Sequence, residues 1–165
     1  MIYAAYYASP LRRITMVEES GYLIGVWFDG QSSMQEFQKN HEVIWKNTPL
    51  FDRTRDWLDH YFRGDAPKMD LPLYTQGSVF QEYVWKILRK IPYGATMSYQ
   101  EVGEEVRKVT GQKRMSAQAV GQAVGKNPIS ILIPCHRVLG KDGSLTGYAG
   151  GTDLKEALLK IEHTI

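Results

Sequence analysis

The sequence predicts an α+β protein of two small domains, an N-terminal domain over residues 1–76 and a C-terminal domain over residues 77–165. The first part contains strand-like runs of aromatic and branched residues, then an aromatic stripe at helical spacing. Residues 65–74, with two prolines, interrupt these patterns and are predicted to be a linker. From residue 78 on, helix-capping residues recur before apolar stripes. We therefore expect a small antiparallel sheet in the first domain and a mainly helical second domain.

Three strands and one helix are predicted in the first domain. The strands are expected over residues 2–7, 13–17 and 21–28, with a turn at Asp29-Gly30. Thr48-Pro49 is a typical helix start, with the threonine as cap and the proline in the first turn. Gly64 is a plausible end of that helix. Its aromatic stripe is predicted to pack in the core.

Three helices are predicted after the linker. Ser78 and Ser98 each start a segment with capping-box spacing, the first with an apolar face that includes Val79 and the second running to about Arg107. A polar connection over residues 110–114 leads to a third cap, Ser116. The helix after Ser116 contains two glycines, and each lowers helix stability by roughly 0.5–1 kcal/mol relative to alanine. They therefore indicate that another group approaches the backbone of this helix closely. This arrangement is typical of a helix-turn-helix.

Composition favours a soluble globular protein. The hydrophobic content of 43% and charged content of 23% are ordinary for that class. The sequence contains no run of about 18 apolar residues, which a membrane-spanning helix would need. We therefore expect no membrane partner. Residues 1–10 lack the pattern of a signal peptide, and the chain has one cysteine. We therefore expect a cytoplasmic protein.

Charge is distributed unevenly although the net charge is only +2. Residues 106–141 contain no aspartate or glutamate but seven cations. A basic face of this kind suits a polyanion such as nucleic acid. The alternative, a solvated surface that merely lacks acidic residues, remains open.

Cys135, the one cysteine of the chain, is the strongest candidate for chemistry. It follows the apolar run 129–133, predicted to be a strand, and is followed by His136 and Arg137. One cysteine cannot form an internal disulfide or a four-thiolate metal site. It is either an inert buried side chain or a nucleophile. The polar and cationic neighbours favour the nucleophile, because they stabilise the reactive thiolate.

The segment Pro134-Cys135-His136-Arg137 resembles the active-site signature of the O6-alkylguanine-DNA alkyltransferases, or methylated-DNA–protein-cysteine methyltransferases. The resemblance is strong over residues 77–163 and weaker over the first 76. It implies a ribonuclease-H-like N-terminal domain and a winged-helix-like C-terminal domain with the helix-turn-helix. The other segments that carry it are Tyr93–Tyr99, Asn127–Ser130, Gly147–Gly151, Lys155–Leu159, Tyr61–Gly64 and Leu71–Leu73.

The resemblance implies a single-turnover DNA repair protein. It would transfer a methyl or larger alkyl group from O6-alkylguanine in double-stranded DNA to Cys135, irreversibly, after flipping the nucleotide out of the stack. Whether O4-alkylthymine is also a substrate stays open. The family's chemistry implies a monomer without a metal or organic cofactor.

Roles for individual residues follow from the resemblance. His136 would take the thiol proton through a bound water, and Glu162 would orient His136. Asn127 would hold the turn before the Cys135 segment, and Tyr99 would contact the flipped base or its 3′ phosphate and donate a proton to the leaving guanine. The pocket around the base would comprise Tyr99, Pro134, Val138, Tyr148 and Ala149. The residues expected to contact DNA are Ser98, Gln100, Lys113, Arg114, Ser116, Ala117, Gln118, Ala119, Gly121, Gly125, Arg137 and Lys141.

Gln118 and Ala149 depart from the family's pattern. At the position of Gln118 the family usually has an arginine that fills the gap left by the flipped base. Glutamine carries no charge and reaches less far, so we expect weaker duplex binding. Ala149 stands where relatives carry serine, in the glycine-rich loop.

Two other functions remain open from the sequence. One is a lesion-recognising or regulatory helix-turn-helix protein without transfer activity. The other is a thiol hydrolase that uses Cys135 and a histidine. In such enzymes the histidine usually comes from a distant sequence position, so the adjacent His136 argues against this class. Saturation at one alkyl group per molecule, against continuous turnover, distinguishes these classes.

Overall fold

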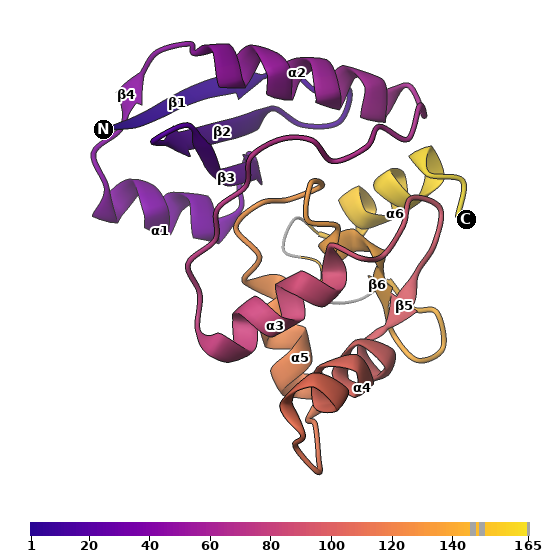
Figure 1. Cartoon of the computed structure of the whole chain (residues 1–165). Coiled ribbons are helices and arrows are strands. Elements are labelled where there is room, and N and C mark those ends of the chain that lie inside the picture. Colours follow the sequence, from indigo (N-terminus) through magenta and orange to yellow (C-terminus); the bar gives the residue numbers. More distant parts are fainter. Residues whose placement is uncertain (146–147, 149–150, 165) are drawn as a thin grey trace. The chain divides into compact units, whose positions relative to one another are not determined.

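The computed structural model describes residues 1–145, 148 and 151–164, which form two compact units (Figure 1). The first unit comprises Met1–Thr75 together with Pro128–Ser130, and the second comprises Gln76–Asn127 and Ile131–Ile165. Among the described residues, no helix is long and apolar enough to cross a membrane.

A four-stranded sheet organises the first unit. Strands β1 (Ile2–Tyr7), β2 (Ile14–Glu19), β3 (Tyr22–Phe28) and β4 (Ile44–Trp45) lie in the order β3-β2-β1-β4. The three predicted strands are confirmed and pair antiparallel, whereas β4, which was not predicted, pairs parallel with β1.

Two helices cover opposite faces of this sheet (Figure 1). Helix α1 (Ser32–Asn40) contributes Met34 and Phe37 to the cluster around Ala4 and Trp27. On the other face lies α2 (Pro49–Phe62). Side chains alternate along a strand, so each face of the sheet receives its own apolar set.

The phenol of Tyr7 joins β1 to α2. Its hydroxyl donates a hydrogen bond to Asp59 at 2.7 Å, and its ring stacks on Phe62. Burial, followed by the Asp59 carboxylate, raises the pKa of Tyr7, so the phenol stays protonated as the donor.

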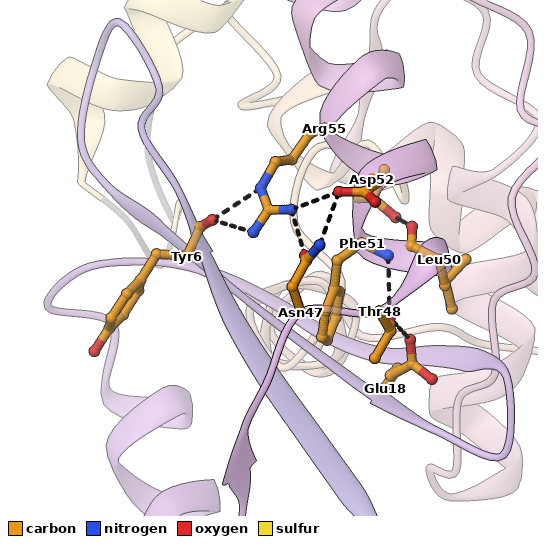
Figure 2. Close-up of polar contacts among 9 residues, drawn as sticks. Tyr6, Glu18, Asn47, Thr48, Leu50, Phe51, Asp52 and Arg55 are labelled. Carbon is orange, nitrogen blue, oxygen red and sulfur yellow. Dashed lines mark hydrogen bonds and ion pairs between the residues drawn. The ribbon is translucent and has the colours of Figure 1, made fainter.

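The start of α2 is fixed by polar contacts to two strands, which Figure 2 shows. The predicted cap is confirmed: Thr48 Oγ1 accepts a hydrogen bond from Phe51 N at 3.3 Å. The same hydroxyl donates to the buried carboxylate of Glu18 on β2. Arg55 donates to the backbone oxygen of Tyr6 on β1, from Nη2 at 3.0 Å and Nε at 3.2 Å.

The outer edge of β3 is occupied by two chain segments. Leu23 N donates to Pro72 O, and Tyr74 N donates to Leu23 O, both at 2.9 Å. The predicted linker is therefore bonded to the sheet along part of its length. The second segment contains Ile129, which forms an isolated β-bridge with Val26.

The strand predicted over residues 129–133 is wrong. Beyond the single bridge of Ile129, the chain turns, and Ile131 adopts a φ of 69°. Ile129, Ile131 and Ile133 are nevertheless buried. A short apolar run indicates burial, and in this segment the burial is achieved by a turn rather than by a strand.

The second unit is mainly helical. The capping boxes at Ser78 and Ser98 are confirmed, as is the cap at Ser116, whose hydroxyl accepts from Ala119 N. The second predicted helix extends beyond Arg107 to Thr110, and Gly111 is its C-cap. The elements are α3 (Val79–Leu88), β5 (Met97–Ser98), α4 (Tyr99–Thr110), α5 (Ala117–Gly125), the 3₁₀ helix η1 (Cys135–Arg137), β6 (Val138–Leu139) and α6 (Thr152–Ile161).

Helices α3, α4 and α5 pack against one another. Trp85 on α3 is buried and donates its indole N–H to Ala123 O on α5 at 2.8 Å. Val79, predicted on the apolar face, is instead 75% exposed. The buried positions Val84, Trp85 and Leu88 follow the helical repeat, and position 79 does not lie on their face.

A short parallel ladder brings α4 beside η1. Met97 pairs with Val138, and Ser98 pairs with Leu139. Because Ser98 caps α4, this ladder places Tyr99, the first residue of the helix, near the end of the Cys135 turn.

Replacing Thr48 by alanine should destabilise the first unit by about 1–2 kcal/mol, because the helix loses its cap and Glu18 loses a hydrogen bond. Thr48→Ser keeps the hydroxyl and is the matched control. Urea unfolding measures both variants. Equal losses for alanine and serine would show that the hydroxyl contributes nothing.

Candidate active site

Cys135 lies in a buried one-turn 3₁₀ helix. The residues Cys135, His136 and Arg137 are 5%, 0% and 8% exposed. The turn is closed by a hydrogen bond from Arg137 N to Pro134 O at 3.0 Å. Cys135 N donates to Ile133 O at 2.8 Å. These backbone hydrogen bonds fix the main chain at Cys135, and burial places its thiol below the protein surface.

Asn127 connects the end of α5 to the cysteine segment. Its buried side chain donates Nδ2 to Ile133 O at 2.8 Å. It also makes a hydrogen bond to the Cys135 thiol. The turn and the nucleophile are thus fixed by one amide side chain.

Glu162 accepts hydrogen bonds from two neighbours of the cysteine. Its Oε2 lies 2.5 Å from His136 Nε2, and its Oε1 accepts from Arg137 Nε at 2.7 Å. Arg137 Nη1 donates in addition to Ile91 O at 2.6 Å. Since Glu162 is 2% exposed, this is a buried network in which each charged group has an opposite partner.

The position of Arg137 differs from its expected contact with DNA. The guanidinium is buried and bonded to Glu162 and Ile91, so it would have to leave both to reach a phosphate. We therefore do not include Arg137 among the proposed DNA contacts. Its place after His136 in the sequence gave no sign that it faces inward.

The electrostatics favour an ionised Glu162 beside a neutral His136. Burial alone raises the pKa of the Glu162 carboxyl, but the hydrogen bonds and charges of His136 and Arg137 outweigh it and lower that pKa to about 2. Burial lowers the pKa of His136, although Glu162 opposes this shift. A neutral imidazole that donates Nε2–H to a carboxylate has its Nδ1 available as a base.

The thiol itself is held in its protonated form. Burial raises the pKa of Cys135, and four groups partly offset it: Asn127, Lys155 and the backbone N–H groups of residues 135 and 136. A protonated thiol is a poor nucleophile, so this cysteine needs a base for reaction.

Lys155 is a site residue that the sequence analysis missed. It lies on α6, is fully buried, and its Nζ lies 5.6 Å from the centre of the Tyr99 ring. Burial lowers its pKa to about 8, opposed by the negative charge of Cys135. Its position on the apolar face of the last helix, between Leu154 and Leu158, is the signal that could have identified it.

The predicted pocket residues are placed as follows. Tyr99 is half-buried, and burial and the negative charge of Cys135 raise its pKa. Pro134, Val138 and Tyr148 are buried. Ala149 lies outside the described residues.

Most residues predicted to contact DNA lie on the surface around α4 and α5. Lys113 and Arg114 line a hollow of about 210 Å³ together with Tyr99 and Gln100. Ser98, Ala119, Gly121 and Gly125 are half-buried. The exposed members of the set are Gln100, Lys113, Arg114, Ser116, Ala117, Gln118 and Lys141.

Within the described part of the chain, no group approaches the two glycines of helix α5 unusually closely. A Cβ on Gly121 would lie 4.0 Å from the Tyr99 ring, an ordinary contact distance. A Cβ on Gly125 would meet no atom of the described residues within 4 Å.

The basic stretch is partly neutralised. Arg107 and Lys108 form ion pairs with Glu104 and Glu105 on the same helix. Among the described residues, no group of three or more histidine, cysteine, aspartate and glutamate side chains is arranged to hold a metal ion.

Glu162→Gln should destabilise the protein by about 3–5 kcal/mol at pH 7, because Arg137 would remain buried without its anion. The folded state lowers the pKa of Glu162 to about 2, so this contribution is present above the ordinary value of about 4.3 and is lost as pH falls toward the folded value. Chemical unfolding at several pH values measures it. The exposed Glu156→Gln on the same helix is the control, and an equal loss in both variants would refute the network's role.

Comparisons with known proteins agree over nearly the whole chain. Residues 2–75 match the ribonuclease-like domain and residues 79–164 the DNA-binding domain of 6-O-methylguanine DNA methyltransferase. A methylated-DNA–protein-cysteine methyltransferase of Haemophilus influenzae is 36% identical over 98% of this chain and 86% of the relative. One of Methanosarcina acetivorans is 37% identical over 98% of both chains.

Solved structures of O6-methylguanine methyltransferases are also similar to this chain. The O6-methylguanine methyltransferase of Mycobacterium tuberculosis superposes with a TM-score of 0.82 at 35% identity, covering 98% of this chain and 93% of that one. A structure described as Mycobacterium tuberculosis OGT in complex with DNA has a TM-score of 0.80 at 37% identity, covering 97% and 92%. From its two matched domains and its relatives, the chain belongs to the 6-O-methylguanine DNA methyltransferase family.

Proposed function

We propose that this protein repairs DNA by transferring a methyl or alkyl group from the O6 of guanine to Sγ of Cys135. Membership of the family makes it a DNA repair methyltransferase whose acceptor is a protein cysteine. The observation that carries the residue assignment is the buried hydrogen bond between His136 and Glu162, next in sequence to the buried Cys135. It supplies a nucleophile, a base and a group that orients the base.

The proposed reaction begins with loss of the thiol proton. The thiol proton passes through a bound water to Nδ1 of His136, since Nε2 faces Glu162. The Cys135 thiolate attacks the alkyl carbon, a carbon–sulfur bond forms, and the bond from carbon to guanine O6 breaks. The guanine departs with the electron pair and takes a proton, for which Tyr99 is the proposed donor. Burial keeps this phenol protonated and therefore able to donate.

The proposed transfer happens once per molecule. The product is a thioether, and the sequence contains no second cysteine to resolve it. The proposal requires no metal or organic cofactor, because the thiolate and the leaving guanine supply the reacting bonds. A free thiol of this kind suits the reducing cytoplasm, where we propose that the protein acts as a monomer.

DNA binding is proposed for the C-terminal domain, residues 77–165, with residues 1–76 as the N-terminal domain. Helices α4 and α5 with their connection form the proposed helix-turn-helix, and Lys113, Arg114 and Lys141 are exposed for phosphate contacts. The alkylated base must leave the stack to meet a buried thiol, so we propose nucleotide flipping. The small side chains of Ala119 and Gly121 would let α5 enter the minor groove.

Incubation with a duplex that contains one O6-methylguanine should add one methyl to the peptide that carries Cys135, and the reaction should saturate at one per protein. Intact mass and peptide mapping measure this. Cys135→Ala is the control and should bind the duplex without gaining mass. Tight binding without any gain by the native protein would instead favour a lesion-recognising protein.

Gln118→Arg should tighten duplex binding severalfold, because a longer charged side chain would fill the gap left by the flipped base and approach phosphates. Gln122→Arg is the matched control, since Gln122 is also exposed on α5. Fluorescence titration with modified and unmodified duplex gives both affinities. If both substitutions increase duplex affinity equally, the increase comes from the added charge and not from filling the gap.

A further inference from the structure

Residues 127–133 form a loop directly before the Cys135 turn. The base of this loop is closed by the hydrogen bond from Asn127 Nδ2 to Ile133 O at 2.8 Å. Its tip, Pro128–Ser130, belongs to the first unit, whereas the residues on either side of the tip belong to the second. Since the loop ends two residues before Cys135, its conformation determines where the segment that carries the nucleophile begins.

The tip of the loop is hydrogen-bonded to β3 and to the start of α1. Val26 N donates to Pro128 O, and Ser130 N donates to Val26 O, both at 2.9 Å. Ser130 is 1% exposed, and its hydroxyl donates to Oε1 of Gln31 at 3.3 Å. These hydrogen bonds hold the tip from its first residue to its last.

The side chain of Gln31 joins the end of β3 to this loop. Gln31 is the N-cap residue of α1, but its side chain makes no capping hydrogen bond. Its Oε1 instead accepts hydrogen bonds from Phe28 N at 2.7 Å and from the Ser130 hydroxyl. Capping alone would favour serine, threonine, aspartate or asparagine at this position, so it does not account for the buried glutamine.

The residue after the tip has a strained backbone. Ile131 is buried and adopts a φ of 69°, in the left-handed region that a β-branched residue rarely enters. Such a conformation persists only where the surrounding contacts over-determine it. The contacts of the tip on one side and the Asn127–Ile133 hydrogen bond on the other supply that constraint. If the tip is released, Ile131 can relax, and the segment that leads to Cys135 moves with it.

We infer that Gln31 is a positioning residue for Cys135, because through Ser130 it holds the loop that places the thiol for attack on the alkyl carbon. This inference rests on the proposed function, which it extends by one buried residue of the first unit. A displacement of about 1 Å can slow a positioned reaction on the order of a hundredfold. A small relaxation of the loop is therefore sufficient to slow methyl transfer.

Ser130→Ala is the mildest test, because it removes one hydroxyl from the loop tip and leaves Phe28 N bonded to Gln31. In single-turnover assays at saturating duplex with one O6-methylguanine, methyl transfer should slow severalfold while duplex affinity stays unchanged. Urea unfolding gives the folded fraction under the assay conditions, and the loss of rate should exceed the loss of folded protein.

A second measurement of the same variant needs no DNA. The thiol of Cys135 is buried in the native protein, and a loosened loop should expose it more often. Iodoacetamide should therefore alkylate Ser130→Ala faster, on the order of fivefold, which is the ratio that loss of one neutral hydrogen bond produces. Because the chain has one cysteine, the mass of the adduct reports this residue alone.

Gln31→Met removes the acceptor of both hydrogen bonds and should change both rates further in the same directions. When it is combined with Ser130→Ala, the two effects should be less than multiplicative, since the bond between these side chains is lost only once. Gln38→Met is the matched control, because Gln38 is exposed on the same helix and undergoes the same chemical change. It should keep both native rates.

Transfer at the native rate in both Ser130→Ala and Gln31→Met would overturn the inference, as would native iodoacetamide rates in both. Fully multiplicative effects in the double variant would also overturn it, because Gln31 would then act independently of Ser130. Failure of the native protein to accept a methyl group would refute the proposed function instead. The iodoacetamide rates, measured without DNA, would still show whether Gln31 holds the loop before Cys135.

Discussion

The site depends on one carboxylate that accepts hydrogen bonds on both of its oxygens. Glu162 binds His136 through Oε2 and Arg137 through Oε1, and all three side chains are buried. Without the carboxylate, the guanidinium would be an uncompensated buried charge and the imidazole would lose its fixed orientation. Arg137 further anchors the turn to Ile91 O. The position of the nucleophile is therefore coupled to the end of α6.

Burial explains both the low resting reactivity of the thiol and the need for its neighbours. It raises the pKa of Cys135, so the sulfur is protected until a base accepts its proton. In the proposed reaction His136 is that base. Tyr99, brought beside the turn by the β5–β6 ladder, is the proposed proton donor to the leaving guanine. The elements that carry these side chains are far apart in sequence, so the folded domain assembles the site.

Local signals in the sequence predicted most of the secondary structure. The caps at Thr48, Ser78, Ser98 and Ser116 are short-range hydrogen bonds, which is why their spacing is readable. Helix α1 buries none of its residues fully and β4 is only two residues long, so neither leaves a clear apolar period. The run 129–133 is apolar because it is buried, and apolarity alone does not distinguish a turn from a strand. The polar neighbours of Cys135 predicted a nucleophile, and the resemblance to a known family predicted roles for His136 and Glu162. The inward orientation of Arg137 and the burial of Lys155 depend on tertiary packing.

In the proposed reaction His136 is a neutral base oriented by an ionised Glu162. The most direct measurement is nuclear magnetic resonance of the ring nitrogens of His136, one of four histidines in the chain. Because burial lowers the pKa of His136, we expect a ring that is neutral from about pH 7 to 8, with the proton on Nε2 and Nδ1 unprotonated. A ring that is charged in that range, or one that carries its proton on Nδ1, would contradict it.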